Sequence, residues 1–166
     1  RAARGPLRRC EHLTIDNREI LAGEHHRARL VVHVHRGAVA PLASFASIGR
    51  KTFICGIARS DVFNCLFARE KLGSTGLGQG VAIPHGRIKG LKQAVGAFLR
   101  LASPVPFDSP DGRPVDLLFV LLVPEQATEQ HLQILSELAQ RFSERVFREK
   151  LQSAPDAATI VALFQG

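Results

Sequence analysis

The sequence predicts an α/β layered domain over residues 57–166, and three observations support this. Two apolar runs, Ala94–Leu101 and Val115–Val123, have the length and composition of strands. Patterns with the three-and-four spacing of helices lie before and after them. Strands interleaved with helices are typical of layered α/β domains. The chain of 166 residues, 45% of them hydrophobic, is long enough to bury one sizeable core.

The first expected element is a helix of about ten residues with Ser60 as its N-cap, ending near Leu72–Gly73. Its apolar stripe consists of Val62, Phe63, Leu66 and Phe67. The glycine-rich loop 73–80 follows. It leads to the apolar run Val81–Ile83, which we expect to be a short strand that stops abruptly at Pro84-His85-Gly86.

The next elements are the two clear strands, joined by the turn-rich stretch 104–114. Val115–Val123 is apolar on both faces, as expected of a central strand covered by helices. A single long helix is predicted from about Thr128 to about Lys150. Its stripe consists of Leu132, Leu135, Leu138, Ala139, Phe142 and Val146. A last helix opens at Ser153-Ala-Pro155, with proline in its first turn and Ile160, Val161 and Phe164 on its buried face.

Residues 1–56 are an atypical segment, basic and rich in histidine and arginine. They hold ten Lys/Arg against four Asp/Glu, or +6, whereas residues 57–166 hold twelve against eleven, or +1, so the basic character belongs to one end. We expect partial disorder or irregular packing there, with a short strand at Leu30–Val34 and a weak helix at Leu42–Ile48. A basic tail for nucleic acid would have interleaved aromatic residues, which this segment lacks, so no nucleic-acid partner is predicted.

Histidine and cysteine spacing predicts no metal site. Five of the seven histidines are His12, His25, His26, His33 and His35, and only His33 and His35 would share a strand face. The cysteines, Cys10, Cys55 and Cys65, are odd in number and lack ligand spacing, which favours a reducing cytoplasm. No apolar run approaches the roughly 20 residues that span a bilayer, and the basic start lacks the features of a secretory signal.

His85 is the candidate for chemistry. It follows a proline, precedes Gly86 and should be reachable, and a neutral imidazole can form a covalent phosphoryl intermediate without a cofactor. Arg69 and Arg87 could balance the phosphoryl charge. Backbone N–H groups and hydroxyls of the loop could bind its oxygens, through Gly73, Ser74, Thr75 and Gly76. Taken alone, a surface histidine and an ordinary turn explain these residues as well, and neither nucleotide-binding glycine motif is satisfied.

The combination of these residues in one segment is more specific than any of them alone. The string Arg69-Glu70, then Gly73-Ser-Thr-Gly-Leu-Gly-Gln-Gly-Val-Ala-Ile-Pro-His85-Gly-Arg87, closely resembles the active-site segment of the fructose/mannitol-type IIA domains of the bacterial phosphotransferase system (PTS), particularly their nitrogen-regulatory branch. The resemblance continues through Pro106-Phe107-Asp108, the strand from Pro114 to Pro124, and His131-Leu at the start of the long helix. It covers residues 57–166.

This resemblance implies a mixed β-sheet flanked by helices and assigns roles to three residues. His85 would be the residue phosphorylated on Nε2 (tele-phosphohistidine), and Arg69 would neutralise the phosphoryl group. His131 would hydrogen-bond the phosphoryl oxygens or orient the ring of His85, although an ordinary polar residue in a first helical turn is the alternative. Leu77 and Ile88 are candidates either for the rim of a carrier-docking surface or for the core.

The resemblance also implies partners. The donor would be an HPr-like phosphocarrier, and the regulated targets would be potassium transporters or sensor kinases, with phosphorylation state as the signal. A sugar-specific IIA component and an unphosphorylated binding module remain alternatives. In the family a helix and a strand beside the catalytic loop precede this segment, and residues 1–56 cannot be matched to them. One hypothesis is that residues 1–56 are not native family sequence, for example translated in another reading frame.

Overall fold

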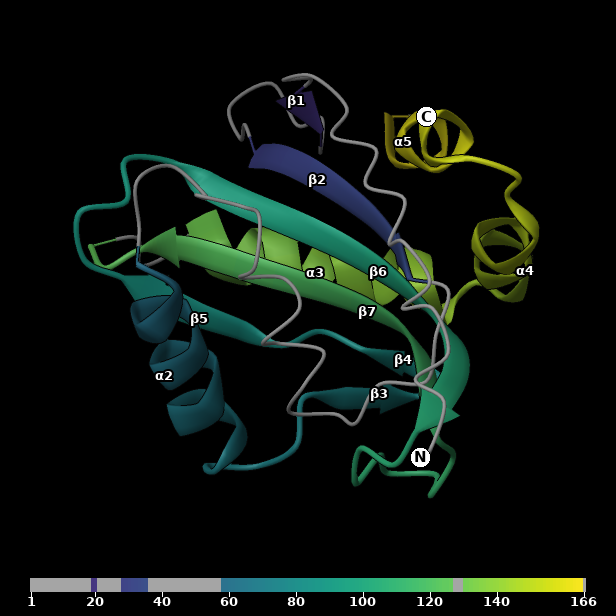
Figure 1. Cartoon of the computed structure of the whole chain (residues 1–166), viewed down its shortest axis with the longest axis horizontal. Helices are drawn as coiled ribbons and strands as arrows, with labels where there is room; N and C mark the ends of the chain where they lie inside the picture. The colour runs from purple at the N-terminus through teal and green to yellow at the C-terminus, as the bar shows by residue number, and fades with distance from the viewer. Residues whose placement is uncertain (1–18, 21–27, 36–57, 127–129, 166) are drawn as a thin grey trace, which may run out of the picture.

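The computed structural model describes residues 19–20, 28–35, 58–126 and 130–165, the first two ranges by their backbone (Figure 1). The elements in chain order are β1 (Glu19–Ile20), β2 (Ala28–His35), α2 (Arg59–Glu70), β3 (Gly76–Gly78), β4 (Val81–Ala82), β5 (His85–Ile88), β6 (Ala94–Val105), β7 (Val115–Pro124), α3 (Gln130–Ser143), α4 (Arg145–Ser153) and α5 (Ala157–Gln165). Among the described residues one helix lies between β2 and β3 and three helices follow β7, and sheet and helices together confirm the α/β prediction.

The strands form one mixed sheet in the order β1-β2-β6-β7-β4-β3, with β5 also paired to β7. β6 and β7 are antiparallel, whereas β2 runs parallel to β6, and both β4 and β5 run parallel to β7. The mixed sheet that the resemblance implied is therefore confirmed. Because β4 and β5 lie one after the other along β7, the chain between them stays at the sheet, and His85 begins β5.

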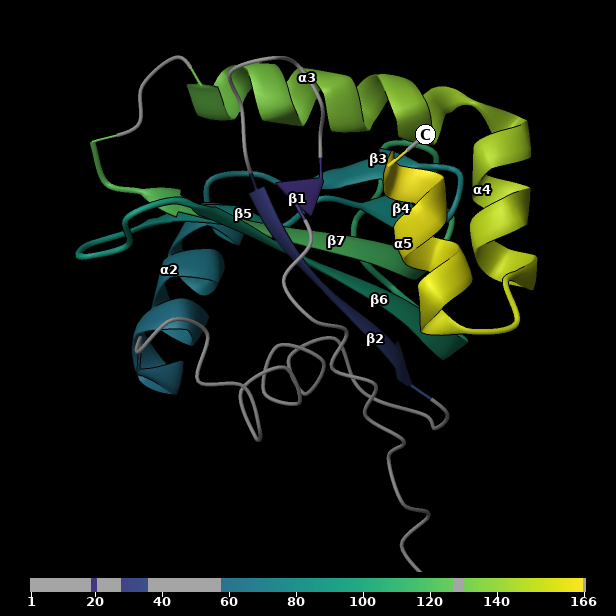
Figure 2. The ribbon, with the colours of Figure 1, turned by 90° about the horizontal axis from the view of Figure 1, so that it is seen from above.

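The central strand β7 separates two apolar clusters. Leu117, Phe119 and Leu121 pack on the side of α3, α4 and α5. Leu118, Val120 and Leu122 alternate with them and pack on the side of α2. Figure 2 shows α3 and α2 on opposite sides of the sheet. The prediction of a central strand apolar on both faces is confirmed, and this two-sided burial fixes the sheet between its helices.

Several predicted boundaries were wrong. The N-cap of α2 is Ala58, with no side-chain cap, and Ser60 lies inside the first turn, where its hydroxyl donates to Asp61 at 3.4 Å. The strand at Ala94 extends to Val105, because its pairing with β7 resumes at Val105 after a register shift. In the last helix Pro155 precedes the first turn, and Asp156 caps it by accepting the N–H of Thr159 at 2.7 Å.

The long helix predicted to Lys150 is two helices. α3 ends at Ser143, Glu144 is extended (ψ 117°), and α4 begins at Arg145. The hydrophobic periodicity does not reveal this break, because a side chain of the next helix stabilises it. The buried guanidinium of Arg148 donates to the carbonyls of Phe142 at 2.6 Å and Ser143 at 2.7 Å, satisfying the end of α3.

Within residues 1–56, the predicted strand at Leu30–Val34 is confirmed as part of β2, which pairs in parallel with β6 from Ala28↔Ala94 to His35↔Leu101. The predicted helix at Leu42–Ile48 lies outside the described residues, as do Cys10 and Cys55. Cys65 is a half-buried free thiol, as its place in the helical pattern suggested. The domain boundary at residue 57 stays a prediction.

Candidate active site

His85 is the first residue of β5, not the residue after a strand as predicted. Pro84 lacks an N–H, so the pairing along β7 is interrupted there, but the Leu121 N–H still donates to the Pro84 carbonyl at 2.9 Å, and pairing resumes at His85↔Leu121. Strand alternation then directs Ile88 into the cluster on the α2 side. His85 and Arg87 consequently share the opposite face of β5, the one toward α3.

Gly86 brings α2 against β5. A Cβ at Gly86 would lie 2.1 Å from Cys65 Sγ, a distance that no side chain tolerates. The Cys65 thiol also donates to the Arg87 carbonyl at 3.1 Å. Because Arg69 lies one helical turn beyond Cys65 on α2, this close approach delivers its side chain to His85.

The hydrogen bonds of His85 define its tautomer. Nδ1 lies 2.9 Å from the Ile83 carbonyl, which can only accept, so Nδ1 carries the proton. Nε2 accepts from Nε of Arg69 at 3.1 Å, and a guanidinium can only donate. The ring is therefore a neutral imidazole whose lone pair is on Nε2, the nitrogen that the resemblance implied would be phosphorylated.

The surroundings keep this ring neutral. Burial lowers the pKa of His85 from its ordinary value of 6.5, and the nearby charge of Arg69 lowers the pKa further. The hydrogen bond to Ile83 and the charge of Glu70 act in the opposite direction without reversing the shift. A neutral ring at physiological pH is the nucleophilic form.

Arg69 is held at two points. Its Nε donates to His85, and its Nη1 donates to the Gly73 carbonyl at 2.9 Å. Glu70, its neighbour, accepts the Thr75 N–H at 3.0 Å and the Thr75 hydroxyl at 2.5 Å. The end of α2 and the glycine-rich loop are thus locked together. The Arg-Glu pair is visible in the sequence as part of the family motif, but the role of Glu70 was not predicted from it.

The loop residues predicted to bind a phosphoryl group lie beside Arg69 but are largely engaged with one another and with the fold. The Ser74 hydroxyl donates to the Phe107 carbonyl at 2.7 Å and accepts the Gly76 N–H at 3.1 Å. The Gly73 N–H donates to the Glu70 carbonyl at 3.1 Å. Among Gly73–Gly76, the N–H of Ser74 is the one without a hydrogen bond to another described residue.

Close packing against Ser109 requires a glycine at position 76. A Cβ there would lie 2.7 Å from Ser109 Oγ and 3.0 Å from Ser109 Cα, so the loop 106–114 needs a glycine opposite it. The phosphoryl-binding role of Gly73, Ser74, Thr75 and Gly76 stays a prediction, with Ser74 as its freest backbone donor.

His131 lies at the start of α3 and is buried, 9% exposed. Its Nε2 lies 3.3 Å from Nη2 of Arg87, while its Nδ1 is buried with no hydrogen-bond partner in the described part of the structure. The structure therefore brings His85, Arg69, His131 and Arg87 together. Arg87 was considered as a cation from the sequence, but its pairing with His131 was not predicted.

Large apolar side chains are exposed next to these residues. Leu72 (85% exposed) precedes the loop, Leu77 (43%) lies in β3, and Leu132 (61%) follows His131. The exposure of Leu77 fits its predicted place at the rim of a docking surface, and that role stays a prediction. Ile88 is 4% exposed and packs in the core, which was the other of the two positions predicted for it. Leu132, predicted in a buried stripe, is exposed because His131 and Ile134 face the sheet instead.

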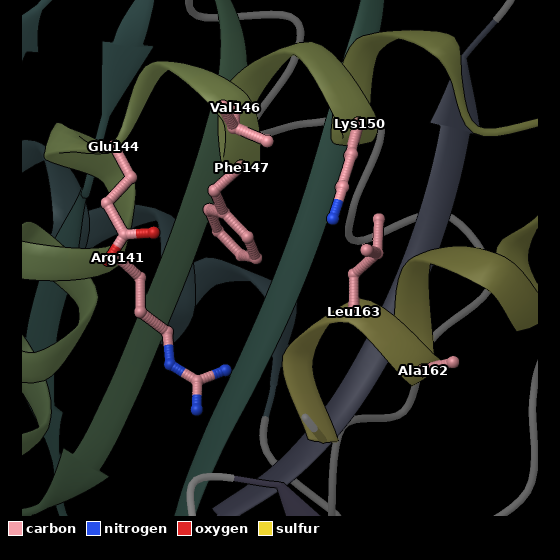
Figure 3. Close-up of a pocket in the computed structure, with 7 residues that line it drawn as sticks. All are labelled: Arg141, Glu144, Val146, Phe147, Lys150, Ala162 and Leu163. Atoms are coloured by element: carbon pink, nitrogen blue, oxygen red, sulfur yellow. The ribbon is translucent and has the colours of Figure 1, made fainter.

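A hollow of about 480 Å³ lies elsewhere, among α3, α4 and α5 (Figure 3). It is lined by Arg141, Glu144, Val146, Phe147, Lys150, Ala162 and Leu163. None of these residues belongs to the group around His85, and Arg141 is already engaged with the Phe164 carbonyl at 2.9 Å. We therefore assign no part of the His85 chemistry to it.

Two kinds of feature are absent from the described residues. These residues contain no group of three or more histidine, cysteine or acidic residues able to hold a metal ion. They also contain no helix that is both long and apolar enough to cross a membrane. The histidines singled out in residues 1–35 lie outside the side chains that the structure describes.

Comparisons with known proteins show the family of the chain. Residues 44–166 match the family model described as the phosphoenolpyruvate-dependent sugar phosphotransferase system, EIIA 2. The nitrogen regulatory protein of Pseudomonas aeruginosa is 54% identical over 99 residues, 60% of this chain and 64% of that protein. The nitrogen regulatory protein of Klebsiella oxytoca is 45% identical over 100 residues, 60% and 62% of the two chains. The match thus spans less than two thirds of either relative.

Solved structures extend the likeness. The nitrogen regulatory protein IIA-Ntr of Neisseria meningitidis is 49% identical, with a TM-score of 0.72 over 81% of this chain and 92% of that one. The mannitol IIA of Escherichia coli, at 20% identity, has a TM-score of 0.65 over 80% of this chain and 94% of that one, which shows the same fold.

Proposed function

The chain belongs to the EIIA type-2 family of the phosphoenolpyruvate-dependent phosphotransferase system, and we propose that it is a phosphohistidine carrier of the nitrogen-regulatory branch, with His85 as the phosphorylated residue. All the residues that this role requires lie within residues 57–166. The nitrogen regulatory names of relatives at 54% and 45% identity support the branch, since the fructose-specific EIIA component of Haloferax volcanii is 38% identical.

The tautomer of His85 carries the proposal. The proton on Nδ1 is held by the Ile83 carbonyl at 2.9 Å, so Nε2 presents a lone pair without first losing a proton. Burial keeps the pKa of the ring below its ordinary value, so this form predominates near pH 7. A nucleophile in this state can attack phosphorus directly.

The reaction moves one phosphoryl group between two histidines. Nε2 of His85 forms a bond to phosphorus while the bond from phosphorus to the donor's ring nitrogen breaks, and the electron pair of that bond stays on the donor. Arg69 donates into the Nε2 lone pair at 3.1 Å in the unphosphorylated protein, so its guanidinium leaves Nε2 as the phosphoryl group arrives and binds the phosphoryl oxygens instead.

His131 and the loop complete the phosphoryl site in this proposal. The buried Nδ1 of His131 has no hydrogen-bond partner within the described residues and is the second donor to the oxygens. The N–H of Ser74 is the third, supplied by the loop whose remaining groups, in Gly73, Thr75 and Gly76, hold its shape.

The proposed donor is an HPr-like phosphocarrier, which docks over the exposed apolar side chains of Leu72, Leu77 and Leu132. The proposed outputs are potassium transporters or sensor kinases, because a phosphoryl group adds close to two negative charges at the docking surface. The cysteine pattern supports a cytoplasmic setting for these encounters.

The test is phosphorylation from phosphoenolpyruvate with the upstream enzyme and an HPr-like carrier. We expect acid-labile, base-stable phosphate on the wild type and none on His85→Ala, with His25→Ala as a matched control that labels normally. Both variants are checked for folding by circular dichroism. No label on a folded wild type would overturn the proposal and favour an unphosphorylated binding module.

A further inference from the structure

The backbone of Arg87 is fixed in β5, and its exposed side chain contacts His131. Its backbone lies in β5 opposite Val123, and its carbonyl accepts the Cys65 thiol at 3.1 Å. Two residues along the strand from His85, it directs its side chain to the same face. From there its Nη2 lies 3.3 Å from Nε2 of His131.

This contact specifies the protonation state of His131. A guanidinium carries donors only and stays charged, so Nε2 of His131 must accept. A neutral imidazole that accepts at one nitrogen carries its proton on the other. A charged His131 would set two N–H donors and two positive charges against each other, which the contact excludes. His131 is thus neutral with its proton on Nδ1.

The proton on Nδ1 then meets no acceptor among the described residues. Nδ1 is buried and unpartnered among the described residues, and His131 is 9% exposed. Buried donors are nearly always satisfied, so an unpartnered one at a reactive site calls for an acceptor that arrives from outside. Arg87, which contacts this ring, lies on the same face of β5 as His85 and two residues away, so the acceptor arrives at the same site.

We propose that Arg87 is a positioning residue that holds His131 as the neutral Nδ1–H tautomer and so presents this N–H as a donor to the incoming phosphoryl group. The acceptor's identity rests on the proposed function, whereas the tautomer does not. Without Arg87, His131 is free to take its proton on Nε2, and the donor is then lost.

The test reads the tautomer directly, by long-range ¹H–¹⁵N NMR of the imidazole nitrogens in the unphosphorylated full chain. Arg87→Lys keeps a cationic donor, so we expect the wild-type pattern with the proton on Nδ1. Arg87→Glu replaces the donor with an acceptor, so we expect the proton on Nε2. Arg87→Met removes the donor without adding a charge, so we expect a mixture.

Lys89→Glu is the matched control, because it makes the same charge change at an exposed position two residues away. It should leave the His131 pattern unchanged. A wild-type proton on Nε2, or an Nδ1 proton that survives in both Arg87→Glu and Arg87→Met, would overturn the inference. If Arg87→Glu does not fold, Arg87→Met and Arg87→Lys still decide it.

Transfer kinetics separate this inference from the proposed function. With the phosphocarrier as donor, Arg87→Met should slow phosphorylation of His85 by about tenfold or more, with Arg87→Lys close to wild type. Equal rates for all three proteins would overturn the role of Arg87 while leaving the carrier function standing. An unphosphorylated wild type would overturn the carrier function, and the tautomers would still test Arg87.

Discussion

Nε of Arg69 lies 3.1 Å from Nε2 of His85, so in the unphosphorylated protein a cation occupies the lone pair that must attack phosphorus. The same guanidinium is anchored by Nη1 to the Gly73 carbonyl at 2.9 Å. One anchor can persist while the other is exchanged for a phosphoryl oxygen, because a guanidinium has five donors in a fixed plane. Arg69 thus covers Nε2 of His85 in the unphosphorylated protein and is placed to bind the phosphoryl group that His85 accepts.

Arg69→Lys tests this double contact. Lysine keeps the charge but cannot bond His85 and Gly73 through one rigid plane, so we expect His85 to be phosphorylated about a hundredfold more slowly, with Arg69→Ala slower still. Rapid-quench kinetics with phosphorylated carrier measure the rate. Lys92→Ala, which alters an exposed cation outside the site, should match the wild type. A rate for Arg69→Lys equal to that of the wild type would show that a planar guanidinium, bonded to both His85 and Gly73, is not needed.

Arg69→Ala also has a predicted effect on the His85 pKa. Arg69 lowers that pKa by its charge, so its removal should raise the pKa toward the ordinary value of 6.5. An NMR titration of the His85 ring measures the change. Burial is the larger cause and remains in the variant, so a recovery that is only partial is the expected result.

The pH dependence of stability follows from the same lowered pKa. The unfolded chain protonates His85 near pH 6.5, whereas the folded chain does so only at lower pH. Above the unfolded pKa both states are neutral and the group contributes nothing. As the pH falls below about 6.5, the unfolded state binds the proton first, and folding stability is lost until the folded pKa is passed.

His85→Gln should therefore lose less stability than the wild type between pH 7.5 and pH 5.5. Urea unfolding at both pH values measures it, with His25→Gln as a control for a histidine outside the described site. Identical pH slopes for His85→Gln and wild type would show that burial does not lower the His85 pKa.

The sequence was sufficient to predict the elements that have a strong hydrophobic pattern, although not all of their caps and boundaries. β7 could be predicted as a two-faced central strand because its apolar run is encoded in consecutive residues. His85, Arg69 and His131 could be proposed as partners because the family motif carries them. Their proximity in space is a property of the fold. Because Gly86 has no side chain, Cys65 of α2 packs against β5, and this packing places Arg69 beside His85.

What the sequence could not predict depends on partners distant along the chain. The exposure of Leu132 and the burial of His131 follow from how α3 lies on the sheet, since either residue fits a three-and-four pattern. The pairing of Arg87 with His131 joins residues 44 positions apart. The break between α3 and α4 has no glycine or proline to signal it, because the Arg148 side chain caps α3.

Gly86→Ala tests the close packing that positions α2. The new Cβ would lie 2.1 Å from Cys65 Sγ, so β5 or α2 must move, and we expect a loss of about 3 kcal/mol in unfolding free energy. Phosphoryl transfer should slow as well, because Arg69 is displaced with its helix. Urea unfolding measures the first effect and transfer kinetics the second.

Cys65→Ala should rescue Gly86→Ala. Removal of the sulfur leaves Cys65 Cβ at 3.6 Å and its backbone carbonyl carbon at 3.5 Å from the new Cβ, which are ordinary contacts. The double variant should therefore be more stable than Gly86→Ala alone, although Cys65→Ala by itself loses the bond to the Arg87 carbonyl. Purely additive losses would show that sulfur is not the obstacle.

Arg148→Met tests the tertiary cap that ends α3. Its buried guanidinium donates to the carbonyls of Phe142 at 2.6 Å and Ser143 at 2.7 Å and also to Oε1 of Gln79, which joins the helix break to the turn between β3 and β4. Methionine fills the volume but leaves these acceptors unsatisfied, so we expect a loss of about 3 kcal/mol in unfolding free energy.

Arg145→Met is the matched control for Arg148→Met, three residues earlier on α4. Arg145 is exposed and pairs with Glu149 at 2.7 Å, and exposed pairs of this kind contribute little, so its replacement should leave the urea midpoint unchanged. If the midpoints of both variants fell equally, charge on α4 and not the cap would set the stability. A fall in the urea midpoint of Arg148→Met alone would show that this buried arginine stabilises the break between α3 and α4. Hydrophobic periodicity does not reveal such a contact, which is why one helix was predicted.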